Sequence, residues 1–246
     1  MGFERINAII FALETTTLIP YILYVERKVS DSAIRNELYG FIELFIMRRI
    51  VTRATTKNYN QLFTDRLILN DILSKQKFLM FLEKQDDKVN FLPTDAQVFD
   101  AIKSGVLTNK QATGVLYLIE SRIRDRVRHS TQLLGINKYS LEHVMPKKWQ
   151  NHWARLNTQQ QIDERNRKLL TLGNLTIITQ ALNASIRDAD WKTKKAGRGA
   201  DKAGLKKYAE GIDTFSDYLD RSVWNESVID ERAEFLYQQA VKVWKV

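Results

Sequence analysis

The chain has 246 residues, of which 44% are apolar and 27% charged, so it can bury a core and is not disordered throughout. It has no cysteine, which excludes disulfides, thiolate catalysis and a zinc site with cysteine ligands. Its net charge of +9 is concentrated in one segment of the chain. Residues 121–210 hold 19 Lys and Arg against 8 Asp and Glu, whereas the rest of the chain has a net charge of −2. A localised basic segment is typical of a nucleic-acid binder, although a solvated basic surface gives the same count.

The first 25 residues are rich in apolar side chains, but they do not fit a membrane span. Glu14, three threonines and Pro20 interrupt the stretch, and a charge at mid-depth of a bilayer costs about 2.5–3.5 kcal/mol. A basic start followed by a short apolar core and a cleavage site is also missing. We therefore expect a pair of buried helices broken near Pro20, and no membrane contact.

Helical periodicity dominates the first 130 residues. Apolar side chains recur on one face of Glu37–Ile50 and again in Tyr59–Leu73. The sequence from Pro93 to Asp95 is a helix-start signal, and Thr113–Val127 has the pattern of another amphipathic helix. This part of the chain is predicted to be a helical spacer or scaffold.

The pattern changes after Gly135. Lys138–Val144 is short and compatible with a strand, and Leu172–Thr179 alternates β-branched and apolar residues as strands do. A Lys-rich helix is expected to start near Asn183. Strand, strand and helix together predict a small ββα unit, with the polar segment 147–170 inserted between the strands as a helix.

Three short motifs carry polar residues suited to chemistry. Residues 141–146 read Leu-Glu-His-Val-Met-Pro, residues 172–176 read Leu-Gly-Asn-Leu-Thr, and Asn183 is followed by Lys192, Lys194 and Lys195. In this combination they resemble the HNH (His-Me finger) nuclease family, which has a histidine on the first strand, an asparagine in the middle element and an asparagine or histidine on the following helix. This form is similar to the C-terminal nuclease domain of GmrSD-type and SspE-type DNA restriction proteins. Because the helical stretch 41–63 is similar to the spacer that precedes the nuclease motif there, the resemblance covers about residues 35–200.

These residue types suit phosphodiester hydrolysis. Imidazole has an unperturbed pKa of about 6.5, so a neutral His143 can accept a proton from water at physiological pH. A hard cation such as Mg²⁺ neutralises charge at the phosphate and takes oxygen ligands, which the Glu142 carboxylate and the Asn183 amide supply. Adjacent strand residues point to opposite faces, so Glu142 and His143 serve one site only if the chain distorts there.

The resemblance implies a role for each motif residue. It makes His143 the general base, Glu142 and Asn183 the ligands of Mg²⁺ or Mn²⁺, and Asn174 the catalytic-site residue that fixes the loop and strand geometry around the base. Lys194 or Lys195 would contact a phosphate, and the other expected DNA contacts are Lys192, Arg198, Lys147 and Lys148. Glu142 departs from the family pattern, in which Asp or His stands at that position in many members. The spacing of 31 residues from His143 to Asn174 is longer than in compact HNH modules, and we attribute the excess to the inserted helix.

Together these observations predict a mainly α-helical, α+β chain with a small ββα-metal nuclease core. The expected domains are a helical scaffold over residues 1–135, the HNH core over 136–205 and C-terminal helices over 206–246 that pack back on the body. The resemblance implies a DNA endonuclease or nickase in restriction and anti-phage defence, acting on duplex DNA with or without modified bases. It also implies a cytoplasmic location in a prokaryote and a nucleotide-handling domain or subunit that precedes this region.

Two other readings of the sequence remain open. The chain is alternatively a non-catalytic nucleic-acid-binding module with an HNH-like fold, or an all-helical interaction domain whose polar residues are incidental. Metal-dependent nicking of plasmid DNA separates the first hypothesis from both alternatives, and salt-sensitive DNA binding separates the two alternatives from each other.

Overall fold

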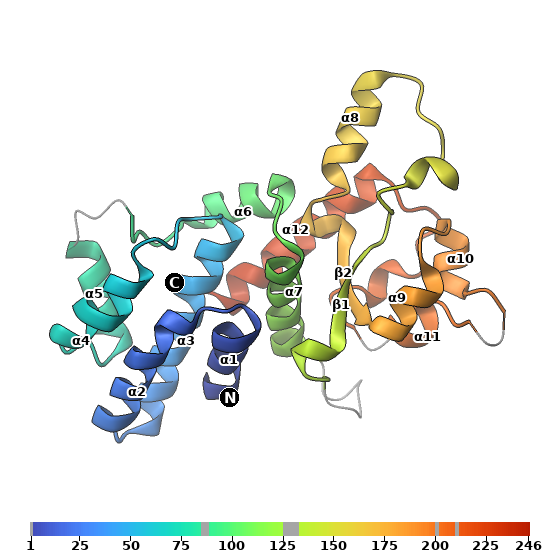
Figure 1. Cartoon of the computed structure of the whole chain (residues 1–246). Helices are drawn as coiled ribbons and strands as arrows, with labels where there is room; N and C mark the ends of the chain where they lie inside the picture. Colours follow the sequence, from blue (N-terminus) through green and yellow to red (C-terminus); the bar gives the residue numbers. More distant parts are fainter. Residues whose placement is uncertain (1, 85–88, 125–132, 200–201, 210–211) are drawn as a thin grey trace. The chain divides into compact units, whose positions relative to one another are not determined.

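The computed structural model describes the chain except for residues 1, 85–88, 125–132, 200–201 and 210–211 (Figure 1). Its described residues form two compact units. Unit 1 comprises residues 1–98 and 242–246, and unit 2 comprises residues 99–241. The domain boundaries expected from the sequence, after residues 135 and 205, stay a prediction.

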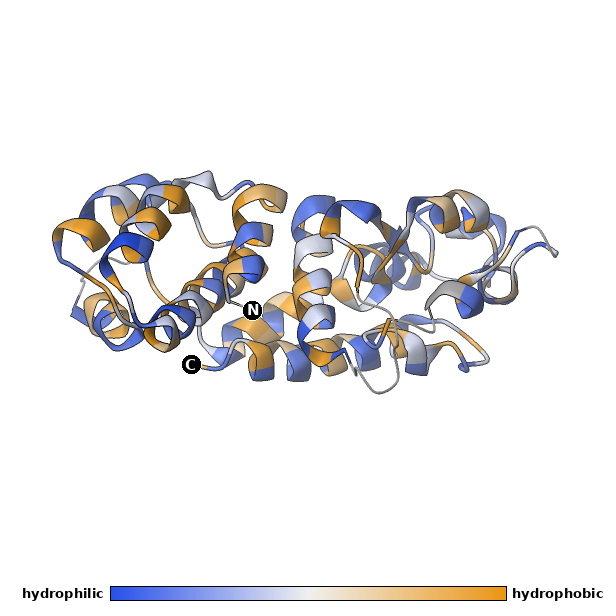
Figure 2. Ribbon diagram, turned by 90° about the horizontal axis from the view of Figure 1, so that it is seen from below, coloured by the Kyte–Doolittle hydropathy of each residue, from blue (hydrophilic) through white to orange (hydrophobic). Residues whose placement is uncertain are grey.

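Unit 1 is helical. Its elements are α1 (Gly2–Asn7), the π-helical turn η1 (Ala8–Ala12), the 3-10 turn η2 (Thr16–Leu18), α2 (Ile19–Lys28), α3 (Ser32–Val51), the π-helical turn η3 (Gln61–Arg66), α4 (Leu67–Leu69) and α5 (Lys75–Lys84). Hydrophobic and hydrophilic residues alternate along these helices (Figure 2). Helix α3 supplies much of the core, with Leu38, Phe41, Ile42, Phe45 and Ile46 each at most 2% exposed.

The expected break in the first helix pair is present, but Pro20 does not make it. The chain leaves helical geometry after residue 12, and Pro20 lies in the first turn of α2. Proline is tolerated there because the first turn of a helix has no internal acceptor for its missing N–H. In the described part of the chain, none of the helices has the length and hydropathy needed to span a bilayer.

Two buried arginines of α3 are used for structure within unit 1. Arg48 donates to the backbone oxygens of Trp244 and Pro93, at 2.7 and 3.0 Å. Arg49 donates to the backbone oxygen of Phe91 at 2.8 Å and is 0% exposed. Since buried charges are tolerated when they are hydrogen-bonded, these guanidinium groups hold the chain ends of unit 1 to its core.

Unit 2 contains the strands. Its elements are α7 (Asn109–Ile123), η4 (Ile136–Lys138), β1 (Tyr139–His143), η5 (Trp149–Asn151), α8 (Gln159–Lys168), η6 (Leu172–Asn174), β2 (Leu175–Thr179), α9 (Gln180–Ile186), α10 (Trp191–Ala196), α11 (Leu205–Ala209) and η7 (Ser216–Tyr218). The unit boundary falls inside the two remaining helices, α6 (Asp95–Ser104) and α12 (Glu226–Val243). The prediction of a mainly helical α+β chain is confirmed.

The sheet of unit 2 has two antiparallel strands in the described residues (Figure 1). Its register places Tyr139 opposite Thr179 and His143 opposite Leu175. Helix α9 starts directly after β2, and the Thr179 hydroxyl accepts a hydrogen bond from the backbone of Leu182 to cap it. The order strand, strand, helix is therefore observed, and α8 lies in the connection where a helix was expected.

Candidate functional site

Glu142 is a buried carboxylate near the end of β1, and its partner is a lysine. The Lys194 ammonium, itself 0% exposed, forms an ion pair with Glu142 Oε1 and donates to the backbone oxygen of His143 at 2.8 Å. Burial raises the pKa of Glu142, and the positive charge of Lys194 opposes that rise. Helix α10 therefore attaches to the strand end through one buried charge pair.

His143 lies at the last position of β1 and is partly buried. Burial, together with the positive charges of Lys147 and Lys194, lowers its pKa to about 4. Its imidazole has no hydrogen-bond partner among the described residues. The side chain is thus a neutral imidazole at physiological pH, in the protonation state that accepts a proton.

Asn183 reaches from α9 to β1. Its amide nitrogen donates to Ser140 Oγ at 3.2 Å and to the backbone oxygen of Leu141 at 3.1 Å. Because strand residues alternate between faces, Ser140 and Glu142 lie on one face of the sheet, and His143 points the other way at the strand end. The hydrogen bonds use only the nitrogen, so within the described structure the amide oxygen of Asn183 stays available to a ligand.

Asn174 is 0% exposed and uses its whole amide group to join three segments. Its Oδ1 accepts from the backbone N–H of Met145 and from Trp224 Nε1, both at 2.9 Å. Its nitrogen donates to the backbone oxygens of Met145 and Leu169, at 2.9 and 3.0 Å. Asn174 therefore fixes the loop that follows His143, and no atom of its amide is left to touch a substrate. Its role in orienting a base stays a prediction.

Arg232 and Gly173 were not singled out in the sequence. Arg232, on α12 and 0% exposed, donates to the backbone oxygens of Thr214, Leu172, Gly173 and Leu175, at 2.7–3.1 Å. A Cβ at Gly173 would lie 2.2 Å from the backbone oxygen of Ile229, also on α12. The Leu-Gly-Asn turn is thus shaped by a C-terminal helix. The only sequence signal was an arginine inside the apolar pattern of that helix.

The lysines and arginines expected to contact DNA differ in exposure. Lys147, Lys148, Lys192 and Arg198 are exposed. Lys195 is partly buried and donates to the backbone oxygen of Arg221 at 2.7 Å. The expectation for Lys194 needs correction, because its ammonium is buried against Glu142 and does not face solvent.

The donor set near β1 fits a hard divalent cation by type. Glu142 Oε2 and Asn183 Oδ1 are oxygen donors without a partner in the described structure, whereas Glu142 Oε1 is held by Lys194. In the part of the chain that the structure describes, no three His, Asp or Glu side chains cluster as a ligand set. Mg²⁺ is compatible with so few protein ligands, because it keeps waters and takes substrate phosphate oxygens.

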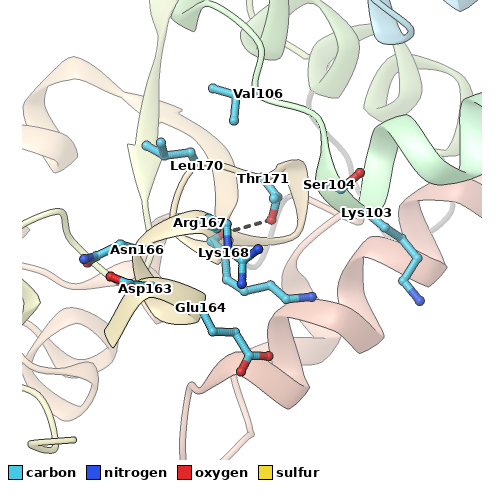
Figure 3. Close-up of a pocket in the computed structure, with 10 residues that line it drawn as sticks. All are labelled: Lys103, Ser104, Val106, Asp163, Glu164, Asn166, Arg167, Lys168, Leu170 and Thr171. Atoms are coloured by element: carbon cyan, nitrogen blue, oxygen red, sulfur yellow. Dashed lines mark hydrogen bonds between the residues drawn. The ribbon is translucent and has the colours of Figure 1, made fainter. Parts of the chain in front are cut away.

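A cavity of about 720 Å³ in unit 2 is lined by other residues (Figure 3). It is formed by α8, the segment after it and the end of α6. Its wall contains basic Lys103 and Arg167 together with acidic Asp163 and Glu164, and none of the predicted site residues. Charges of both signs do not favour a phosphate, so the cavity is not part of the candidate site.

The comparison with protein families gives a match over residues 93–239, more than half of the chain, to the C-terminal domain of GmrSD restriction endonucleases. The chain belongs to this family. The matched range begins before α6 and ends within α12, so it includes β1, β2, Asn174, Asn183 and the Arg232 contacts. No match was found among curated proteins. Membership in the GmrSD C-terminal domain family indicates a nuclease of the restriction-endonuclease type.

Proposed function

We propose that this GmrSD C-terminal-type domain is a metal-dependent, HNH-type endonuclease or nickase that hydrolyses phosphodiester bonds of DNA in the restriction of foreign DNA. The observation that carries the proposal is the uncommitted imidazole of His143 at the end of β1, next in sequence to Glu142 and on the strand that the α9 residue Asn183 contacts. A binding function alone does not require this combination of base and oxygen donors.

His143 is proposed as the general base that takes a proton from the attacking water at its free imidazole nitrogen. Asn174 holds the backbone N–H and C=O of Met145, so it fixes the position of the segment that follows the base. Glu142 and Asn183 would hold Mg²⁺ or Mn²⁺. When bound, such a cation neutralises negative charge on the phosphate and on the departing oxygen. The exposed Lys147, Lys148, Lys192 and Arg198 bind flanking phosphates.

One observation favours the alternative, a non-catalytic nucleic-acid-binding module. Lys194 occupies Glu142 Oε1 and so competes with a cation for that carboxylate. A chain in which this pair persists would bind DNA through its basic surface and leave it intact.

Nicking of supercoiled plasmid separates the two functions. The purified chain should relax the plasmid in Mg²⁺ or Mn²⁺ and be inactive in EDTA. His143→Ala should fold and bind DNA normally but cleave about 10²–10⁴-fold more slowly, the usual effect of removing a general base. Full activity in a folded His143→Ala protein would exclude His143 as the base, and DNA binding with no metal-dependent nicking would favour the binding module.

A further inference from the structure

A second cavity of about 480 Å³ lies beside the candidate site in unit 2. Four ring side chains line it, namely His152, Trp153, Trp191 and Trp224. Trp191 and Trp224 are 6% and 3% exposed, whereas Trp153 is partly exposed and His152 exposed. The cavity therefore has two buried indoles as its floor and two accessible rings at its edge, and its volume is in the range of about 300–1,000 Å³ typical of ligand pockets.

The three indoles are fixed in place. Trp153 Nε1 donates to the backbone oxygen of Ala189 at 3.3 Å, and Trp191 Nε1 donates to that of Arg221 at 2.9 Å. Trp224 Nε1 donates to Asn174 Oδ1 at 2.9 Å. Each N–H is thus satisfied inside the protein, so the rings are preorganised in fixed orientations.

Two connections place this cavity next to the strand end that carries His143. The first runs through Trp224, because Asn174 also accepts from the backbone N–H of Met145, two residues after His143. The second is α10, which contributes Trp191 to the cavity wall and Lys194 to the ion pair with Glu142. A DNA strand held at His143 therefore passes close to the ring-lined cavity.

The polar groups of the cavity suit the edge of a nucleobase. Asn225 uses its amide oxygen to accept from the backbone N–H of Val228 at 3.1 Å, which leaves its amide nitrogen as a donor. Lys192 and Ser222 also line the cavity, and neither side chain has a hydrogen-bond partner among the described residues. Arg165 and Glu226 neutralise each other by an ion pair. Rings with a few free hydrogen-bonding groups are the chemistry by which proteins hold an unstacked base.

We propose that the cavity lined by Trp153, Trp191 and Trp224 holds one nucleobase of the DNA substrate, turned out of the base stack beside the cleavage site. The inference rests on the proposed function, because it takes DNA as the substrate. The base stacks on Trp153 and His152, and its edge meets Asn225 and Lys192. Phosphates on either side of the turned-out nucleotide contact Lys147 and Lys148, which precede the cavity segment in the sequence.

Binding to three labelled duplexes in EDTA tests this assignment. The duplexes differ at one central position, which carries a paired base, a mispaired base or an abasic site. Turning a base out of the stack costs a few kcal/mol, and this cost is smallest at a mismatch. The chain should therefore bind the mispaired duplex about tenfold more tightly than the paired one. The abasic duplex deforms as readily but offers no base to stack, so it should bind at least about fivefold more weakly than the mispaired duplex.

Filling the cavity provides the matched variants. Ala154 and Ser222 are exposed residues of its lining, so Ala154→Trp or, if that protein does not fold, Ser222→Trp should bind all three duplexes equally. Ala96→Trp, an exposed alanine on α6 outside the lining, should keep the preference. A wild-type chain without preference, or a folded filled variant that keeps it, overturns the proposal.

Plasmid nicking in Mg²⁺, measured on the same preparations, separates this result from the proposed function. Nicking without a mismatch preference would leave the nuclease and remove the base pocket. A preference without nicking would keep the pocket as part of a DNA-binding module. A chain that binds none of the duplexes would overturn both proposals.

Discussion

At the scale of single residues, Lys194 shows how burial changes the role of a basic side chain. The sequence presents Lys192, Lys194 and Lys195 as equivalent, yet only Lys194 is completely buried. It shares one face of α10 with the buried Trp191, three residues earlier, whereas Lys192 points to solvent. The spacing of three residues from Trp191 was the available sequence signal that Lys194 is buried, and counting charges does not use it.

Replacing Lys194 by methionine should destabilise unit 2 strongly. The variant leaves Glu142 buried without its counter-ion, and breaking one partner of a buried pair costs about 3–5 kcal/mol. Urea unfolding of Lys194→Met against the wild type measures this loss. We also expect the variant to lose nicking activity, because the same ammonium holds the backbone oxygen of His143.

The double variant Lys194→Met with Glu142→Leu is the control for that loss. Replacing a buried ion pair by apolar side chains of similar volume is often neutral, so most of the stability should return. Cleavage should not return, since the proposed metal ligand is gone. Equal destabilisation in the single and double variants would show that something other than the uncompensated charge causes the effect.

Asn183→Ala should raise the Mg²⁺ concentration needed for half-maximal nicking while changing DNA affinity little. The variant removes the free amide oxygen proposed as a cation ligand, whereas affinity comes mainly from basic side chains. Ser140→Ala is the matched control, because it removes one hydrogen bond to Asn183 and leaves the amide oxygen. An unchanged Mg²⁺ titration in Asn183→Ala, or an equal shift in both variants, would make Asn183 a purely structural link between α9 and β1.

At the scale of elements, α12 belongs to the site although it lies far from it in the sequence. Arg232 binds the carbonyl oxygens of the turn η6, and Gly173 allows the backbone of Ile229 to pass closely. This turn positions Asn174, and Asn174 fixes the loop after His143 through its hydrogen bond with Met145. The segment that follows His143, the proposed base, is therefore positioned by a chain of contacts that begins on the C-terminal helix.

Gly173→Ala tests the close approach of α12. The added Cβ would lie 2.2 Å from a backbone oxygen, so the helix or the turn must move. Overpacking of this kind costs about 1–3 kcal/mol, and the displaced turn should lower nicking as well. Gly40→Ala is the matched control, because nothing lies within 4 Å of its added Cβ and alanine favours a helix by about 0.5–1 kcal/mol. Urea unfolding should show opposite signs for the two variants, and a stable, fully active Gly173→Ala protein would contradict the argument.

The elements were easier to predict from the sequence than the contacts between them. Local patterns placed β1, β2 and the start of α6, where Thr94 exchanges hydrogen bonds with Gln97. The Lys194–Glu142 pair and the contacts of Arg232 with Leu172, Gly173 and Leu175 join residues more than fifty positions apart. No periodicity within one element encodes such pairings, so the burial of Lys194 and the role of α12 could not be derived from the pattern alone.

At the scale of the whole molecule, the basic segment 121–210 divides into internal and external charges. Lys194 and Arg165 are buried and paired with carboxylates, and Lys168 pairs with Asp230 on α12. These cations stabilise the fold and contribute little to a phosphate surface. The exposed Lys147 and Lys148, which follow His143 by four and five residues, are better placed to meet DNA.

Reversing Lys147 and Lys148 to glutamate should therefore lower both DNA affinity and its dependence on salt. Each phosphate contact contributes about −0.9 to the slope of log K against log salt concentration, so losing two contacts should make the slope shallower by about 1.8. Fluorescence anisotropy over a salt series measures both quantities. The control reverses Lys75 and Lys77 of α5, which lie where the charge balances near neutrality, and should change neither. Equal losses in the two double variants would mean that long-range charge, rather than contacts beside His143, governs binding, and the placement of the cleavage site on the basic segment would lose its electrostatic support.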